Sequence, residues 1–88
     1  MAERSVRILN KNGLHARPAA EIVKISARFQ SEVTLVHGGM EVNGKSIMGV
    51  MMLAAECGAT VVLRTEGSDA DEAIDALAAL ILNKFGER

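Results

Sequence analysis

A short segment near the N-terminus combines residue types that could bind and carry a phosphoryl group. The segment is residues 13–19, GLHARPA. Pro18 predicts the first turn of a helix, because proline fixes φ and lacks an N–H that this turn does not need. His15 then lies at or next to the helix N-cap, where the backbone N–H groups of Ala16 and Arg17 and the positive end of the helix dipole favour an anion. A nucleophilic imidazole, two amide donors and a guanidinium could hold a phosphoryl group covalently at this point.

His15 is the residue best placed to act as a nucleophile near neutral pH, where a neutral imidazole keeps a lone pair on one ring nitrogen. Transfer through histidine divides phosphoryl transfer into two easier steps and depends on electrostatic stabilisation of the phosphoryl oxygens. Arg17 and the helix N-terminus could supply it, and Gly13 lets the loop approach closely. A surface histidine that simply precedes a helix-starting proline explains the same spacing, so the segment alone leaves both interpretations open.

A second segment, residues 45–53, is apolar on nearly every side if it is helical. Such a helix needs burial all round, which a chain of 88 residues cannot provide, so part of it must stay at the surface. Not all of its large apolar side chains can face inward together: Ile47, Met48, Met51 and Met52. Those at the surface would suit the binding of several partners, because methionine is flexible and polarizable. A thinly covered core helix with methionine as filler is the alternative.

Ser46 stands just before this apolar segment, where it is predicted to be the helix N-cap. Capping alone accounts for a serine at this position. A phosphate added there would be tolerated at the helix N-terminus, and it would place a charge of about −2 beside the apolar residues. Ser46 is therefore also a candidate for regulatory phosphorylation.

The elements that must position these residues follow from hydrophobic periodicity and turn residues. Gly58 is predicted to end the second helix in the left-handed conformation. Ser68 or Asp69 should cap the third helix, which is predicted from about residue 70, and Asp71 or Glu72 should complete a capping box. The predicted strands cover about residues 4–10, 32–37, 40–43 and 59–66, and the predicted helices about 16–29, 47–55 and 70–81. The order β-α-β-β-α-β-α predicts an α+β fold, with an antiparallel sheet and all helices on one side. No linker divides the chain, so residues 1–88 are expected to form a single domain.

Composition argues against several classes of protein. A net charge of −1 disfavours a nucleic-acid-binding module and a polybasic membrane anchor. Cys57 is the single cysteine, which excludes a disulfide framework, and His15 and His37 lack the further ligands that a metal site needs. The apolar run is too short for membrane insertion, and no signal segment precedes the first strand. We therefore expect a cytoplasmic protein without metal, cofactor or nucleic-acid partner.

Taken together, residues 13–19 and residues 43–51, NGKSIMGVM, resemble the HPr family, the histidine phosphocarriers of the bacterial phosphoenolpyruvate-dependent phosphotransferase system. The resemblance extends over essentially the whole chain in length and element order. It implies an open-faced β-sandwich, in which three helices cover one side of a four-stranded antiparallel sheet. It also favours the phosphoryl-acceptor interpretation of His15.

The resemblance further implies roles for individual residues in and near the two segments. His15 would accept a phosphoryl group on Nδ1 from phosphorylated enzyme I, which takes it from phosphoenolpyruvate, and would pass it to a histidine of an enzyme IIA domain. Arg17 would help to hold and release the group. The surface shared by both partners would consist of Ala16, Ala20, Lys24, Ile47, Met48 and Met51. The chain is thus expected to be a carrier and protein substrate rather than an enzyme, and a monomer.

The resemblance leaves the branch of the family open. In members regulated by HPr kinase/phosphorylase the matching serine is phosphorylated, and Ser46 stands at that position. Because His15 is present, the chain does not resemble the paralogue that lacks this histidine and works only as a regulator. A nitrogen-branch homologue, which feeds a regulatory cascade, shares the His15 motif and is one alternative. A purely regulatory module, whose exposed helix binds a transcription factor or an enzyme, is another.

Overall fold

The computed structural model describes residues 1–86, and within them four strands form one antiparallel sheet. The strands are β1 (Ala2–Arg7), β2 (Glu32–His37), β3 (Met40–Asn43) and β4 (Thr60–Glu66). Their order across the sheet is β1-β4-β2-β3, so the two edge strands are β1 and β3. The first strand of the chain therefore pairs with the last strand, which joins segments that are far apart in the sequence.

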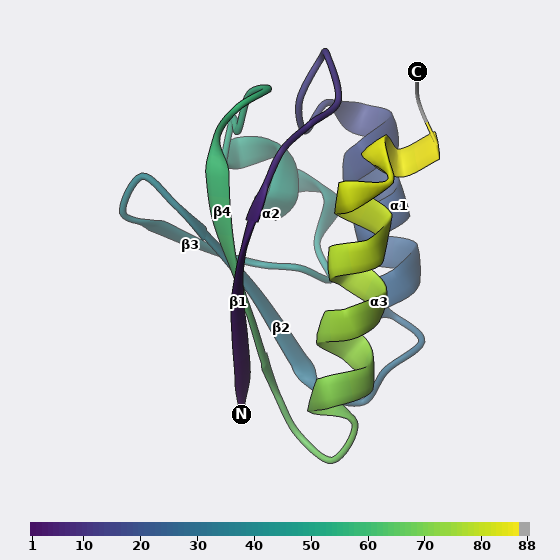
Figure 1. Ribbon diagram of the computed structural model, residues 1–88. Coiled ribbons are helices and arrows are strands. Elements are labelled where there is room, and N and C mark those ends of the chain that lie inside the picture. Colours follow the sequence, from purple (N-terminus) through teal and green to yellow (C-terminus); the bar gives the residue numbers. More distant parts are fainter. Residues whose placement is uncertain (87–88) are drawn as a thin grey trace.

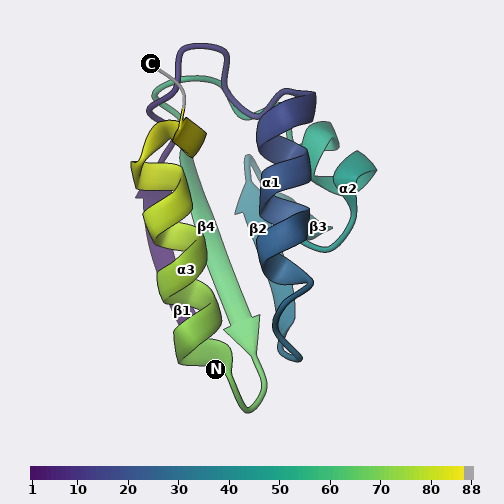
Figure 2. The same ribbon diagram turned by 90° about the vertical axis from the view of Figure 1, so that its right-hand side faces the viewer.

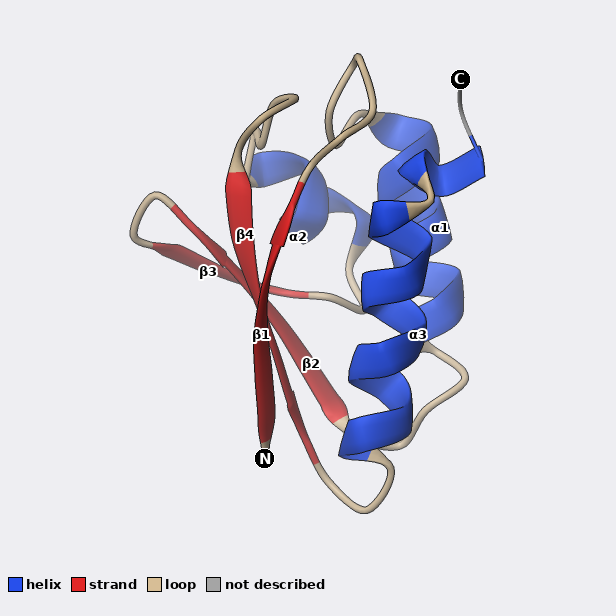
Figure 3. Cartoon of the chain, viewed as in Figure 1, coloured by secondary structure: helices blue, strands red, loops and turns tan. Residues whose placement is uncertain are grey.

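Three α-helices lie on one side of this sheet, as Figures 1 and 3 show, and leave the other face uncovered. They are α1 (Ala16–Ser26), α2 (Ile47–Met52) and α3 (Ala70–Leu82), and a short 3₁₀ turn, η1 (Lys84–Gly86), follows α3. Figure 2 looks onto the helices with the sheet behind them, and α1 lies between α3 and α2. The predicted element order and the predicted one-sided antiparallel fold are confirmed for the described residues.

The core fills the space between the sheet and the helices. Strand residues alternate as predicted, with Val61 and Leu63 buried and Val62 and Arg64 on the opposite face. The largest fully buried apolar side chains come from every layer: Ile8, Ile22, Leu35, Val50, Val61, Leu63, Leu77 and Ile81. Burial of each such side chain contributes about 1.5–3 kcal/mol before conformational entropy is subtracted. This shared core holds α1 and α2 in place on the sheet.

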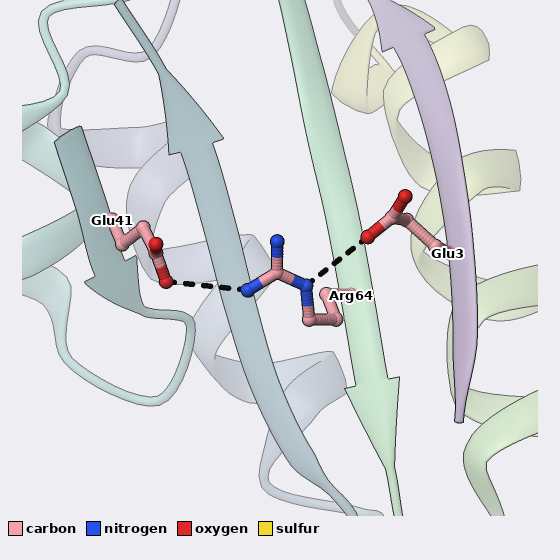
Figure 4. A network of polar contacts seen from close by, with 3 residues as sticks. All are labelled: Glu3, Glu41 and Arg64. Carbon is pink, nitrogen blue, oxygen red and sulfur yellow. Dashed lines mark hydrogen bonds and ion pairs between the residues drawn. The ribbon is translucent and has the colours of Figure 1, made fainter. Parts of the chain in front are cut away.

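The uncovered face of the sheet carries polar side chains. Figure 4 shows Arg64 of β4 between Glu3 of β1 and Glu41 of β3. Arg64 Nε donates to Glu3 Oε2 at 3.1 Å, and Nη1 donates to Glu41 Oε1 at 3.2 Å. These exposed pairs connect three strands across the sheet but add little stability, because water screens them.

The helix and strand ends differ from prediction where long-range contacts decide them. β1 begins and ends earlier than predicted because it pairs with β4 from Ala2 opposite Thr65 to Arg7 opposite Thr60. α1 ends at Ser26 rather than near residue 29. The chain must turn there so that the backbone around residue 30 can bond to the start of α3.

The prediction that Gly58 ends α2 is wrong. The helix ends at Met52, the buried Leu53 is the C-cap residue, and Ala54 takes the left-handed conformation with φ +52°. This early turn allows the Ala55 carbonyl to accept from the Leu14 N–H at 2.9 Å. A contact with a distant loop thus fixes the end of the helix.

The predicted capping box at the start of α3 does not form. Asp69 is the N-cap residue, but its side chain makes no capping bond within the described chain. Its carboxylate instead accepts from the N–H groups of Gln30 and Ser31, both at 2.9 Å, and from the Ser31 hydroxyl. The bond from the Ser31 hydroxyl is the largest cause that lowers the pKa of Asp69. Asp69 therefore connects the start of α3 to the loop after α1.

No helix within residues 1–86 is both long enough and apolar enough to cross a lipid bilayer.

Candidate functional site

His15 lies at the N-cap of α1, as the position of Pro18 predicts. Its backbone is extended, with φ −78° and ψ −172°, and its carbonyl accepts the Ala19 N–H at 3.0 Å as the first bond of the helix. Pro18 is buried in the first turn, whereas His15 is half-buried. The imidazole is thus held at the positive end of the helix dipole, within reach of solvent.

Two loops from distant parts of the sequence fix the position of His15. The Leu14 N–H donates to the Ala55 carbonyl at 2.9 Å, and Asn10 Nδ2 donates to the Gly13 carbonyl at 2.7 Å. Gly13 has φ +65°, and a Cβ atom here would overlap the Ala55 carbonyl oxygen. Glycine is therefore required both for the conformation and for the close approach. The loop before α1 and the loop after α2 form one support for the N-terminus of α1.

Arg17 is the second residue of α1 and points toward the end of the described chain. Its Nη2 donates to the Phe85 carbonyl at 2.9 Å. Lys84 and Phe85 have φ values of +55° and +56°, and the Phe85 side chain is 3% exposed. The buried ring anchors the strained turn, which presents its carbonyl to the guanidinium. Sequence reasoning missed this contact, because no residue type identifies a backbone carbonyl as an acceptor.

The α2 patch consists of the exposed apolar side chains of that helix: Ile47, Met48, Met51 and Met52. They line a shallow hollow on the surface, while Val50 is the residue of α2 that is fully buried. The predicted surface exposure of the helix is confirmed, and the alternative of a core helix filled with methionine is wrong. Met52 belongs to the patch although the predicted docking residues did not include it.

The α1 residues predicted for the same surface share one helix face, since Ala16, Ala20 and Lys24 are spaced by four. Ala16 and Lys24 are exposed, and Ala20 is half-buried. α1 and α2 pack against each other, and Lys45 Nζ adds a bond to the Phe29 carbonyl at 2.9 Å. The structure therefore places the two predicted groups on neighbouring helices.

Ser46 is the N-cap residue of α2, as predicted. Its Oγ accepts from the Gly49 N–H at 3.1 Å, and its carbonyl accepts from the Val50 N–H at 3.0 Å. The side chain is half-buried and directly precedes Ile47 of the α2 patch. The hydroxyl therefore bonds to the N-terminus of α2 and belongs to the residue next to the α2 patch.

The remaining candidate residues lie apart from one another. Cys57 is exposed, with Sγ 3.7 Å from the Leu9 carbonyl oxygen, and His37 Nδ1 lies 3.3 Å from the Thr60 carbonyl oxygen. Within the described chain, no group of three or more His, Cys, Asp or Glu side chains could hold a metal ion.

Comparison with known proteins identifies the family of this arrangement. A family model described as the PTS HPr component phosphorylation site matches residues 2–83. The chain belongs to the HPr family. It is 53% identical to the phosphocarrier protein HPr of Cupriavidus necator, over 99% of this chain and 98% of the relative. The crystal structure of HPr-C-His from Thermoanaerobacter tengcongensis has a TM-score of 0.96 and 48% identity, covering 100% of this chain and 99% of that one. The chain is therefore a phosphocarrier of the phosphotransferase system.

Relatives from other branches of the HPr family are also similar to this chain. A phosphocarrier protein NPr from Shewanella violacea is 42% identical, covering 97% of this chain and 93% of the relative. An HPr-like protein Crh from Halalkalibacterium halodurans is 49% identical, over 92% of this chain and 96% of the relative. An HPr dimer from T. tengcongensis has a TM-score of 0.79 and 48% identity, covering 99% of this chain and 100% of that one. Membership of the family is thus compatible with more than one branch and with either a monomer or a dimer.

Proposed function

We propose that His15 accepts a phosphoryl group from phosphorylated enzyme I and passes it to an enzyme IIA domain. The observation that carries this proposal is the position of the imidazole at the N-terminus of α1, with Arg17 in the same turn. When the group is accepted, the lone pair of Nδ1 forms a bond to phosphorus while the bond from phosphorus to enzyme I breaks. On delivery, a histidine nitrogen of the IIA domain attacks phosphorus and the P–Nδ1 bond breaks. In both steps the attacking and leaving nitrogens lie in line, so the protein contributes position and charge rather than acid–base chemistry.

The helix N-terminus and Arg17 stabilise the charge of the transferred group. Exposed anions at such a terminus gain about 0.3–1 kcal/mol, and the N–H groups of Ala16 and Arg17 are the backbone donors at this position. The Arg17 guanidinium contacts the neutral Phe85 carbonyl, and phosphoryl oxygens bind a guanidinium more strongly because the bond is charge-assisted. Arg17 therefore exchanges one acceptor for the other when His15 is phosphorylated.

The α2 patch and one face of α1 form the docking surface for both partners. A carrier must release one protein before it binds the next, and a flexible apolar surface suits two differently shaped partners. The α1 side of the surface is formed by Ala16, Ala20 and Lys24. The α2 side is formed by Ile47, Met48 and Met51, to which the exposure of Met52 adds a fourth residue.

Ser46 is the site through which HPr kinase/phosphorylase regulates the carrier. Its Oγ lies at the N-terminus of α2 and next to the docking surface. A phosphate on it is compatible with the helix, but it introduces charge where enzyme I needs an apolar contact. Phosphorylation of Ser46 therefore slows transfer to His15.

Incubation with phosphoenolpyruvate and enzyme I tests the proposal. One phosphate per chain should appear, labile in acid and stable in base, and His15→Ala should abolish it. His37→Ala is the matched control, since His37 is the other histidine of the chain, and it should keep the label. Equal labelling of the wild type and His15→Ala would show that the proposal is wrong.

The nitrogen branch is the second candidate, and similarity to the NPr protein of Shewanella violacea supports it. Phosphorylation rates with enzyme I of the carbohydrate branch and of the nitrogen branch distinguish the two, and the faster donor identifies the branch. A purely regulatory module, supported by similarity to the Crh protein, predicts instead that Ser46→Asp alters partner binding while His15→Ala changes nothing.

We also propose that residues 1–88 form a single domain and work as a cytoplasmic monomer. A carrier that presents one docking surface to successive partners needs no second copy. Sedimentation at micromolar concentration should give one species of about the 9.4 kDa chain mass, and a species of twice that mass would contradict this.

A further inference from the structure

Thioether groups are concentrated on the α2 patch. The chain has five methionines, and three of them lie in the six-residue helix α2. Met48, Met51 and Met52 are 73%, 43% and 60% exposed. The two others, Met1 and Met40, lie in the N-terminal segment and on the edge strand β3. Exposure makes a methionine sulfur accessible to small oxidants.

We propose that the α2 patch is a reversible oxidation site at which peroxide switches off docking of enzyme I. This inference rests on the proposed function, in which the patch contacts enzyme I. In the step, a lone pair of the methionine sulfur attacks one peroxide oxygen, an S–O bond forms and the O–O bond breaks. The sulfur loses two electrons, and the leaving hydroxide takes up a proton to become water. Methionine sulfoxide reductases reverse the step by oxidising two thiols to a disulfide and releasing the oxygen as water.

Oxidation of the patch leaves the fold intact, because its sulfurs do not hold the fold together. Among the described residues, no methionine belongs to the buried core. α2 is fixed instead by the buried side chain of Val50, by the Ser46 cap and by Leu53 at its end. The buried core and the cap contain no group that peroxide at modest dose would attack.

Oxidation changes the chemistry of the surface almost completely. Of the four side chains in the α2 patch, only Ile47 lacks a sulfur. A sulfoxide adds a strong hydrogen-bond acceptor to each of the others, and an apolar interface leaves that acceptor unsatisfied. The loss should slow phosphorylation by enzyme I at least roughly tenfold at subsaturating concentration.

The test uses full-length protein carrying Cys57→Ser, because the exposed thiol of Cys57 would also react with peroxide. Samples are treated with graded hydrogen peroxide, and mass spectrometry locates the sulfoxides. The phosphorylation rate with enzyme I is then divided by the rate of the same protein before treatment. A variant with Met48→Leu, Met51→Leu and Met52→Leu removes the patch sulfurs, and the matched control carries Met1→Leu and Met40→Leu.

We expect the Cys57→Ser protein and the matched control to slow at least tenfold, and the triple leucine variant to change less than twofold. Reductases specific for both sulfoxide epimers, supplied with dithiothreitol, should restore the rate, and circular dichroism should stay unchanged. Sulfoxides on the patch without slowing, equal slowing of the triple variant, or loss of the folded spectrum would each overturn the inference. Phosphorylation of the untreated protein reports separately on the proposed function, so the two failures are distinguishable.

Discussion

α1 and α2 both begin after an N-cap residue with extended backbone, but the two N-cap side chains are used differently. His15 and Ser46 are both N-cap residues with extended backbone. Ser46 caps its helix through Oγ, whereas the His15 side chain makes no capping bond in the described structure. The serine therefore stabilises its helix, while the position of the histidine depends on the loops around it. The proposed function assigns phosphoryl transfer to the N-terminus of α1 and regulation to the N-terminus of α2.

The two helices also differ in how firmly the surrounding structure holds them. α1 is an eleven-residue helix with four buried residues, and its start is fixed by Gly13, Leu14 and Ala55. α2 has six residues, one of them buried. A reacting group needs a rigid support, whereas a docking surface needs exposure and adaptable side chains. The proposed function therefore assigns the reacting group to the firmly held α1 and the docking surface to the exposed α2.

Removal of the Arg17 guanidinium from the N-terminus of α1 should have the largest effect on phosphoryl transfer. Arg17→Ala is expected to slow phosphoryl transfer roughly ten- to hundredfold, because a charge-assisted donor to the phosphoryl oxygens is lost. Rapid-quench measurement of transfer from enzyme I checks this. Arg17→Lys keeps the charge but not the planar fork, so its rate should lie between the two. A rate for Arg17→Ala within twofold of wild type would show that Arg17 plays no part in transfer.

A negative charge at Ser46, the N-cap of α2, should slow phosphoryl transfer less than removal of the Arg17 guanidinium. Ser46→Asp is expected to slow transfer from enzyme I about tenfold, because a carboxylate still suits the helix N-terminus but opposes an apolar contact. Ser46→Ala is the matched variant. It should lower the free energy of unfolding by about 0.5–2 kcal/mol through loss of the cap, with transfer little changed. If both variants transferred at the wild-type rate, Ser46 could not act as a switch.

Loss of the Asp69 carboxylate at the start of α3 should have the smallest effect, which concerns stability and is seen only at acid pH. The pKa of Asp69 is lowered chiefly by the Ser31 hydroxyl, so the folded state favours the ionised carboxylate. Its contribution to stability is therefore complete above its ordinary pKa of 3.8 and is lost as pH falls through the lower folded value. Urea unfolding of the wild type should weaken below about pH 4 more steeply than that of Asp69→Asn. Parallel pH profiles would contradict the account of Asp69 as a tether.

The sequence predicted those features that depend on neighbouring residues. Pro18 predicts His15 at a helix start, the position of Ser46 predicts a cap, and the predicted bounds of β2 and β3 match the observed strands. Their causes are local, namely a fixed φ, a side-chain oxygen and a glycine turn.

Features that depend on distant contacts could not be predicted. Ala54 rather than Gly58 ends α2 because Ala55 must meet Leu14, and Asp69 bonds across to Ser31 rather than to its own helix. The Phe85 carbonyl beside Arg17 is a third case. Each contact joins segments whose approach is set by the sheet and the core, which no local pattern encodes.

We propose above all that one atom at the N-terminus of α1, Nδ1 of His15, carries the phosphoryl group. Phosphorylated protein, prepared with phosphoenolpyruvate and enzyme I, can be studied by ¹H–¹⁵N correlation NMR of the imidazole together with ³¹P detection. We expect a single phosphohistidine, at residue 15, with phosphorus bound to Nδ1. Phosphorus on Nε2 of His15, on His37 or on Ser46 would contradict it.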